Sequence, residues 1–146
     1  MKLFITALLL SLMLPVQNLK ATTMEQNCLA LNIYHEANGQ SKLDMRAVGH
    51  VTANRVKSKQ FPDSICRVVY QKSQFSWTVH KSKSTNLRGF AKSEEVAENI
   101  LSGKDKDVTS GATYFYDYRR VKPRWSHRMS ETLRTDVHSY RKPVRS

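Results

Sequence analysis

Apolar side chains recur at helical spacing in the segment that follows the first twenty or so residues. Residues 24–38 carry Leu29, Ile33 and Ala37 at intervals of four, which is the period of one face of an α-helix. Gly39 comes directly afterwards and can end a helix by adopting a left-handed conformation. The pattern therefore predicts a helix over residues 24–38 that stops at this glycine.

A second helix is predicted to begin at Ser41. Serine is a favoured N-cap, and Asp44 stands three residues later, as in a capping box that has Asp in place of the usual Glu or Gln. Met45, Val48 and Val51 then follow at helical spacing. We therefore expect two helices joined by a short turn, with Asp44 belonging to the cap of the second.

Weaker signals mark three further elements. Asp63 or Ser64 can cap a short helix, and residues 92–104 have the composition of a longer helix capped by Ser93. Residues 108–118 alternate and are rich in β-branched and aromatic side chains, which predicts a strand. Residues 72–86 have no helical period and are interpreted as loop or short extended structure, and residues 119–146 form a basic and aromatic tail that ends loosely. These elements predict a helix-dominated α+β fold with a small β element.

The first 23 residues differ from the rest of the chain. Lys2 provides a short positive start, residues 3–14 are almost entirely apolar, and Pro15 interrupts them. Such a run is too short for a typical transmembrane helix and is typical of a signal peptide. We therefore predict a signal peptide or N-terminal anchor over residues 1–23 and a catalytic domain over residues 24–146, exported to the periplasm, cell wall or medium. A buried N-terminal helix is the alternative.

The charge of the chain indicates an anionic partner. The 146 residues include 24 Lys and Arg against 12 Asp and Glu, a formal charge of +12, and removal of the leader would lower it by two. For an exported protein the candidates are nucleic acid, membrane lipid and cell wall polymer. The basic residues are scattered along the chain, so charge alone does not choose among these partners.

Two cysteines, Cys28 and Cys66, make up the whole cysteine content. In an exported protein an even pair is typical of a disulfide, which would close a long loop. Two buried free thiols are the alternative.

Candidate catalytic chemistry narrows to a carboxylate. His35 and Glu36 begin like the zinc motif H-E-x-x-H, but Gly39 occupies the position that the second histidine needs, so we expect no metal. The chain contains no G-x-S-x-G nucleophile motif. A Glu at the C-terminal end of an apolar helix can be half buried, and both burial and the helix dipole then raise its pKa. Glu36 is therefore a candidate general acid for cleaving a glycosidic bond.

Several motifs occur in an order that resembles one enzyme family. They are Tyr-x-Glu-Ala-x-Gly at residues 34–39, "VTANRV" at 51–56, "FPDSICRVVYQ" at 61–71, "QFS" at 74–76, "GATYFYDYRRVKPRW" at 111–125 and "DVHSY" at 136–140. This series resembles the SleB-type cell wall hydrolases, which include spore-cortex-lytic enzymes and phage-encoded relatives. The resemblance extends over about residues 28–140. Gln40 stands where the family often has Glu, and Asp117 where it often has Asn.

The resemblance implies a lysozyme-like fold related to the lytic transglycosylases. It implies that Glu36 is the catalytic acid and that the substrate is the β-1,4 bond between N-acetylmuramic acid and N-acetylglucosamine in peptidoglycan. The candidate substrate-binding residues are Tyr34, Gln74, Ser76, Trp77, Tyr114, Trp125 and His138. With Glu36 as a single acid and base, the reaction would need no cofactor and no second carboxylate.

The partners expected on this interpretation are peptidoglycan glycan strands within an anionic cell envelope, with no nucleic acid and no stable protein partner, and the protein is expected to be a monomer. Two rival functions remain open at this point. One is an exported basic protein that binds nucleic acid or lipopolysaccharide without catalysis, and the other is a zinc-dependent peptidoglycan amidase. The outcome of the reaction, hydrolysis or transglycosylation, and a cellular or phage origin also stay open.

Overall fold

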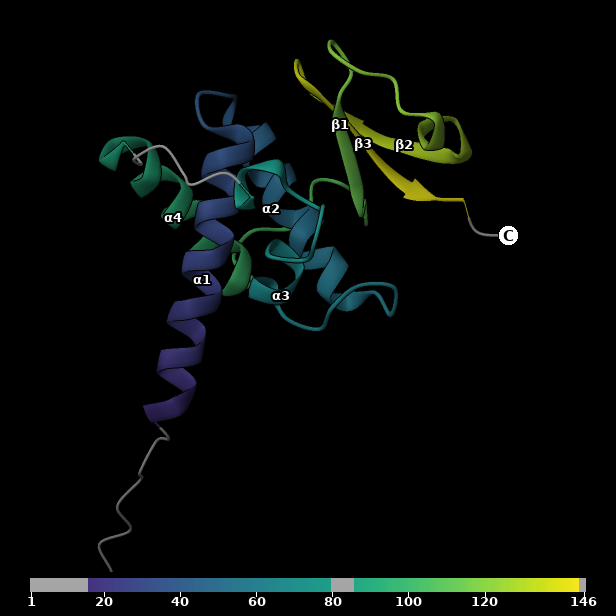
Figure 1. Cartoon of the computed structure of the whole chain (residues 1–146). Helices are drawn as coiled ribbons and strands as arrows, with labels where there is room; N and C mark the ends of the chain where they lie inside the picture. Colours follow the sequence, from purple (N-terminus) through teal and green to yellow (C-terminus); the bar gives the residue numbers. More distant parts are fainter. Residues whose placement is uncertain (1–15, 80–85, 145–146) are drawn as a thin grey trace, which may run out of the picture.

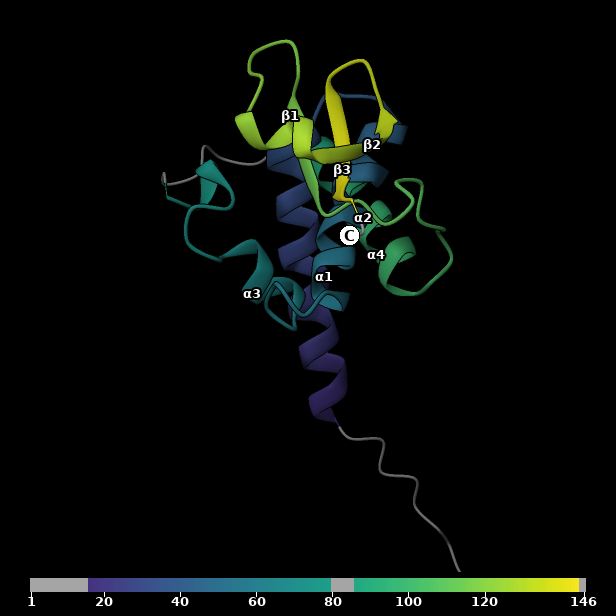
Figure 2. The same cartoon turned by 90° about the vertical axis from the view of Figure 1, so that its right-hand side faces the viewer.

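A long helix, α1 (Val16–Ala37), forms the axis of the molecule, and its N-terminal part extends away from the rest (Figures 1 and 2). The computed structural model describes residues 16–79 and 86–144. The elements that follow α1 are α2 (Lys42–Lys57), α3 (Ile65–Val69), the 3₁₀ helix η1 (Ser76–Thr78), α4 (Leu87–Leu101), β1 (Tyr114–Asp117), the 3₁₀ helix η2 (Arg124–Arg128), β2 (Met129–Arg134) and β3 (His138–Pro143).

The helical core forms around α1, which packs against α2, α3 and α4. Leu29 and Ile33 of α1 are fully buried, as the helical period predicts. Gly49 lets α2 approach its neighbours closely, since a Cβ at this position would lie 2.5 Å from Cδ1 of Ile100 in α4 and 3.0 Å from Cδ1 of Ile33. The helices therefore bury one continuous apolar core between them.

The three strands form an antiparallel sheet in the order β1-β3-β2, which lies beyond the C-terminal end of α1 (Figures 1 and 2). The sequence predicted no element within residues 119–146, but β2 and β3 both lie there. The central strand β3 has no alternation to detect: His138, Ser139 and Tyr140 are all buried in succession. A strand covered on both faces loses the period of two that marks a half-exposed one.

The predicted helix caps have mixed outcomes. Ser41 and Ser64 cap α2 and α3 with their hydroxyl groups, as expected. The predicted start of α4 is wrong, because Asn86 caps this helix by accepting from the backbone N–H of Gly89. Ser93 lies buried inside α4 and donates to the carbonyl of Gly89. An N-cap signal at Asn86 was overlooked because the preceding stretch has no periodic pattern.

Two other boundaries differ from the prediction. The strand predicted over residues 108–118 is confined to Tyr114–Asp117, and the first helix begins at Val16 instead of residue 24. Residues 1–15 of the predicted leader lie outside the described part of the chain, so the leader stays a prediction. Between residues 16 and 79 and between 86 and 144, no helix combines the length and apolarity needed to cross a membrane.

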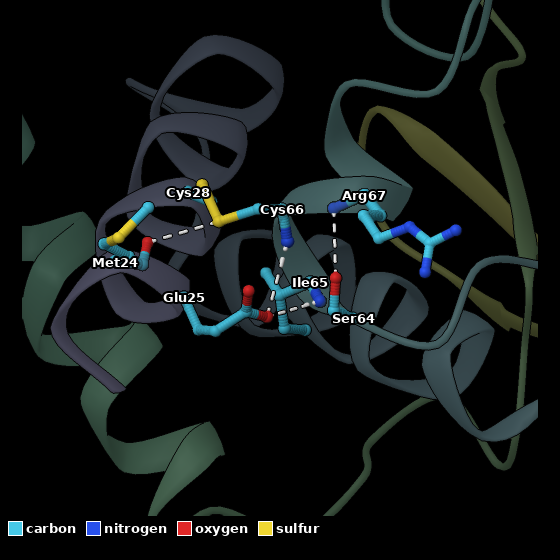
Figure 3. The surroundings of a disulfide bond; sticks show 7 residues. All are labelled: Met24, Glu25, Cys28, Ser64, Ile65, Cys66 and Arg67. Carbon is cyan, nitrogen blue, oxygen red and sulfur yellow. Dashed lines mark hydrogen bonds between the residues drawn. A yellow bond between two sulfur atoms is a disulfide. The ribbon is translucent and has the colours of Figure 1, made fainter. Parts of the chain in front are cut away.

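The predicted disulfide between Cys28 and Cys66 is confirmed, and it joins α1 to α3 with a Cα–Cα distance of 5.2 Å. Figure 3 shows a second link beside it: Oε2 of Glu25 accepts from the backbone N–H of Ile65 at 2.5 Å and from that of Cys66 at 3.4 Å. A carboxylate of α1 therefore satisfies free N–H groups at the start of α3, whose positive end it also neutralises.

Removal of the disulfide tests how much it stabilises the fold. The cysteines are 38 residues apart, so replacing both with serine should lower the free energy of unfolding by about 3–4 kcal/mol in the chain-entropy model. Urea unfolding followed by circular dichroism measures this change, and the wild type under strong reductant is the matched control. Equal midpoints for oxidised and reduced protein would contradict the prediction.

Candidate active site

Glu36 is the second-last residue of α1, at the end of the helix that faces the sheet. The helix stops at Ala37, and Gly39 takes a φ of 82°, the left-handed conformation expected of a glycine that ends a helix. The turn is closed by bonds from the Asn38 N–H to the Tyr34 carbonyl and from the Gln40 N–H to the Ala37 carbonyl, both 3.0 Å. This turn holds Glu36 at the junction between the helices and the sheet.

Glu36 lines a cavity of about 480 Å³ at this junction. The walls come from the end of α1, from α2, from the segment around η1, and from β1, β3 and the residues next to them. The lining consists of His35, Glu36, Asn38, Gln40, Arg55, Gln74, Phe75, Ser76, Trp77, Phe115, Tyr116, Asp117, Arg119, Arg120, Val121, Val137 and His138.

The Glu36 carboxyl is held in its protonated form to higher pH than an ordinary glutamate. Burial raises the pKa of Glu36. Positive charge at His138 and Arg55 acts to lower this pKa, but the effect of burial is larger. No residue of the described part of the chain makes a hydrogen bond to this carboxyl group. The carboxyl group therefore lines the cavity with a raised pKa and without a hydrogen bond from the described residues, a state suited to donating a proton.

Arg55 of α2 supplies a fixed positive charge beside Glu36. Its side chain is 5% exposed, its Nε donates to the carbonyl of Thr113 at 2.8 Å, and its guanidinium lies over the rings of Phe61 and Phe75, 5.1 Å and 5.4 Å from their centroids. Burial lowers the pKa of Arg55 to about 10, so it stays charged at neutral pH. A carboxylate formed at Glu36 would be stabilised by this charge.

One wall of the cavity is aromatic. Trp77 stacks on His35 with ring centroids 4.3 Å apart, and its Nε1 donates to Oδ1 of Asn32 at 3.3 Å. Gln74 and Ser76 precede Trp77 in the chain, line the same cavity and are exposed, so their polar groups are free to meet a ligand. An oriented indole with polar side chains in the same cavity is the type of surface on which a sugar ring can stack.

Beneath the cavity lies a buried network centred on Asp44. Its Oδ1 accepts from Oγ1 of Thr135 at 2.6 Å and from the hydroxyl of Tyr140 at 2.8 Å, and its Oδ2 lies 2.8 Å from Nδ1 of His138. Burial acts to raise the pKa of Asp44, but the hydrogen bonds from His138, Thr135 and Tyr140 outweigh it and lower the pKa. Asp44 is thus an ionised buried carboxylate. Its backbone N–H donates to the capping hydroxyl of Ser41 as expected, but its carboxylate bonds to Thr135, His138 and Tyr140 instead of to the cap.

Asp117, the second acid of the cavity, is engaged by arginine. It accepts from Nε and Nη2 of Arg119, both at 3.1 Å, and Arg120 lies 3.4 Å away. These hydrogen bonds lower the pKa of Asp117, against a smaller opposing effect of burial. The pKa values of the two acids of the cavity are therefore shifted in opposite directions, because Asp117 has arginine partners at hydrogen-bonding distance and Glu36 has none among the described residues.

The cavity brings together five of the eight residues predicted for catalysis or binding: Glu36, Gln74, Ser76, Trp77 and His138. The other three lie outside its lining. Tyr34 accepts from the backbone N–H of Asn86 at 2.8 Å, while Tyr114 and Trp125 pack against each other with centroids 5.5 Å apart. Their observed contacts are with protein.

A second cavity of about 480 Å³ adjoins the first, and Asn38 and Gln40 line both. Basic side chains on its walls come from α2 and α4: Lys42, Arg88 and Lys92. In residues 16–79 and 86–144, no group of three or more His, Cys, Asp or Glu side chains gathers where it could hold a metal ion.

The profile of the cell wall hydrolase family matches residues 39–141. The chain belongs to this family. Among solved structures, the hydrolase resembles the catalytic domain of Bacillus cereus SleB, with a TM-score of 0.70, 20% identity, and coverage of 82% of this chain and 91% of that one. It also resembles the SleB catalytic domain of Bacillus anthracis, described as a germination-specific lytic transglycosylase, with a TM-score of 0.67, 20% identity, and coverage of 81% and 93%. A search of curated proteins found no match.

These likenesses show that the hydrolase has the lysozyme-like fold expected from the sequence. Family membership identifies it as a peptidoglycan-degrading enzyme that acts outside the cytoplasm. The matched range begins three residues after Glu36. The place of Glu36 in the site therefore depends on the cavity and not on the profile.

The sequence of the hydrolase carries a signal for the buried role of Asp44. Asp44 stands four residues before Val48 and eleven before Arg55, on the face of α2 that is buried. A carboxylate on the buried face of a helix needs partners, so its position alone argued against a solvated cap. The identity of those partners could not be deduced, because Thr135, His138 and Tyr140 are more than 90 residues away.

Replacing Asp44 with Asn should lower the free energy of unfolding by about 3 kcal/mol at neutral pH, because three hydrogen-bond partners lose a buried anion. The pKa of Asp44 is lowered in the folded state, so its stabilisation is present above the ordinary aspartate pKa of about 3.9 and is lost as pH falls below it. The difference between wild type and variant should therefore shrink in acid. Urea unfolding between pH 3 and pH 7 measures it.

Asp63→Asn is the matched control for this prediction. Asp63 is exposed and pairs with Arg67 at 2.8 Å on the surface, so its loss should change the free energy of unfolding by less than about 0.5 kcal/mol. Equal effects of the two substitutions would show that the buried network contributes no special stability.

Proposed function

We propose that this hydrolase is a lytic transglycosylase that cleaves the β-1,4 bond between N-acetylmuramic acid and N-acetylglucosamine, with Glu36 as its catalytic acid. The observation that carries the proposal is the state of Glu36, a carboxyl without hydrogen-bond partners among the described residues, whose pKa is raised by burial, in a cavity of about 480 Å³. Such an acid can protonate a leaving oxygen near neutral pH.

The reaction begins with proton transfer from Glu36 to the glycosidic oxygen as the bond from that oxygen to C1 of the muramic sugar breaks. Positive charge develops on the sugar, and the muramic 6-hydroxyl closes on C1 to form a 1,6-anhydro product, either directly or after attack by the 2-acetamido oxygen. Glu36, now a carboxylate beside Arg55, can receive the hydroxyl proton. This route requires no carboxylate nucleophile.

The arrangement of the other acid supports a mechanism with one carboxyl group. A retaining glycosidase of the usual type needs a second carboxylate as nucleophile close to the acid. Asp117, the other acid of the cavity, accepts two bonds from Arg119 and has a second arginine nearby. Its negative charge is therefore neutralised, which makes it a poor nucleophile. Gln40, at the position where the family often has Glu, also lines the cavity and supplies only a neutral amide.

The shape of the site suits a polymer. The two cavities adjoin at Asn38 and Gln40, so together they form a longer site across the turn between α1 and α2. Trp77, Gln74 and Ser76 would contact sugar rings beside Glu36. The basic side chains of the second cavity would face the carboxylates that peptidoglycan carries on its muramic lactyl groups and stem peptides.

The predicted leader completes the proposal. Residues 1–23 would direct the chain across the membrane, to the side where its substrate lies. The enzyme would then be free if this leader is cleaved, or anchored to the membrane through it if the leader is retained. We expect the enzyme to act as a monomer on glycan strands, without a cofactor.

Glu36→Gln should reduce the rate of dye release from labelled peptidoglycan by at least about 100-fold, because an amide cannot donate a proton to the leaving oxygen. In the wild type the rate should fall as pH rises through the raised pKa of Glu36, since the acid form is the active one. Glu98→Gln, an exposed residue of α4, is the matched control and should retain the wild-type rate. Full activity of Glu36→Gln would refute the proposal.

Product masses decide between transglycosylation and hydrolysis. Mass spectrometry of digested peptidoglycan should show muropeptides ending in 1,6-anhydromuramic acid, which are lighter than reducing-end muropeptides by one water. A predominance of reducing ends would establish a muramidase, and activity lost to a chelator would favour the amidase. Salt-sensitive DNA binding without wall cleavage would favour the binding protein.

A further inference from the structure

The proposed mechanism makes no use of the histidine that lines the same cavity as Glu36. His138 begins β3 and is 6% exposed, and its ring meets the edge of Phe115 with centroids 5.2 Å apart. When its ring is protonated, its charge lowers the pKa of the Glu36 carboxyl, so the two groups are electrostatic neighbours. A basic group in this position has consequences for the proton that the attacking hydroxyl must lose.

The two nitrogens of the His138 ring have different environments. Nδ1 lies 2.8 Å from Oδ2 of Asp44, and the other carboxylate oxygen of Asp44 already accepts from Thr135 and Tyr140. Asp44 is ionised and can only accept hydrogen bonds, so Nδ1 must be the nitrogen that carries hydrogen. In the neutral ring this leaves Nε2 unprotonated, and no described residue donates a hydrogen bond to Nε2.

We propose that His138 is a second catalytic residue, a general base whose Nε2 takes the proton of the attacking hydroxyl, and that Asp44 is the positioning residue that fixes its tautomer. The inference rests on the proposed function and reassigns its last proton transfer from Glu36 to His138. An imidazole whose Nδ1–H is held by a buried carboxylate is suited to this role, because the carboxylate both orients the ring and stabilises the cation that forms.

Two protons move while the bonds at C1 are exchanged. The proton of Glu36 passes to the glycosidic oxygen, which leaves with the electron pair of its bond to C1. The muramic 6-hydroxyl oxygen forms the new bond to C1, and its proton passes to Nε2 of His138. The enzyme then holds a Glu36 carboxylate and a protonated His138, and transfer of one proton between them through solvent restores the starting state.

Titratable and charged groups approach His138 from every neighbouring element. The helices contribute Asp44 and Arg55 from α2 and Glu36 and His35 from α1. The sheet contributes Tyr140 from β3 itself and Asp117 from β1, which pairs in register with His138. Arg119 comes from the segment after β1. A change in the pH profile must therefore be assigned by substituting His138 itself.

His138→Asn is the substitution that separates catalysis from folding. An asparagine amide can place its N–H where Nδ1 lies and keep the bond to Asp44, but it has no group at the position of Nε2. We expect a loss of about 100-fold in the rate of dye release from labelled peptidoglycan. We also expect the acid limb of the rate profile, which reports protonation of the base, to disappear. A residue with only a structural role would lower the rate equally at every pH.

His127→Asn is the matched control, because His127 is exposed in η2 and lies outside the cavity. It should keep the wild-type rate and pH profile. If His138→Asn is folded and retains activity within about threefold with its acid limb intact, the proposal is wrong. If His138→Asn is active but Glu36→Gln is inactive in the same assay, the role of His138 is refuted and the proposed function stands. Full activity of Glu36→Gln would instead overturn the proposed function.

Nitrogen NMR of wild-type protein labelled with ¹⁵N-histidine tests the tautomer even if His138→Asn fails to fold. At the pH of maximal activity, the signals assigned to His138 should show hydrogen on Nδ1 and an unprotonated Nε2. Hydrogen on Nε2 at that pH, in the neutral or the charged ring, would remove the base and overturn the proposal.

Discussion

The buried carboxylate of Asp44 is the interaction on which the rest of the structure depends. It stands in the first turn of α2 and binds Thr135, His138 and Tyr140, which precede or form the central strand β3. These bonds join the sheet to the helical core, and the cavity that contains Glu36 lies at the junction they create. Because an unpaired buried charge is so unfavourable, the network allows one placement of β3 against α2.

Two acids eight residues apart show how environment sets chemistry. Glu36 and Asp44 are both shielded from water, but Asp44 has three hydrogen-bond donors and Glu36 has none among the described residues. Burial without partners favours the neutral acid, whereas burial with donors favours the anion. The turn around Gly39 thus separates an acid of raised pKa from a buried anion, and the anion in turn holds Nδ1 of His138.

Local signals predicted the helical half of the fold well and the sheet poorly. Ser41 and Ser64 act through bonds within three residues of themselves, so their roles could be inferred from spacing alone. The strands β2 and β3 escaped notice because the central strand is buried on both faces and carries polar residues. Of the candidate site, Glu36 and His138 were identified through the family resemblance, but the partners of Asp44 could not be.

The sequence by itself determined the helices, the disulfide between Cys28 and Cys66, and the family to which the chain belongs, since these depend on local spacing or on motif order. Only the tertiary structure decided which acid has a raised pKa, which histidine nitrogen is held by a buried carboxylate, and which aromatic residues line the cavity. Those properties arise from contacts between α1, α2, β1 and β3, which the fold brings together from positions up to about a hundred residues apart. Desolvation and hydrogen bonding between residues so far apart in the sequence follow from how the elements pack, and a local sequence pattern does not specify that packing.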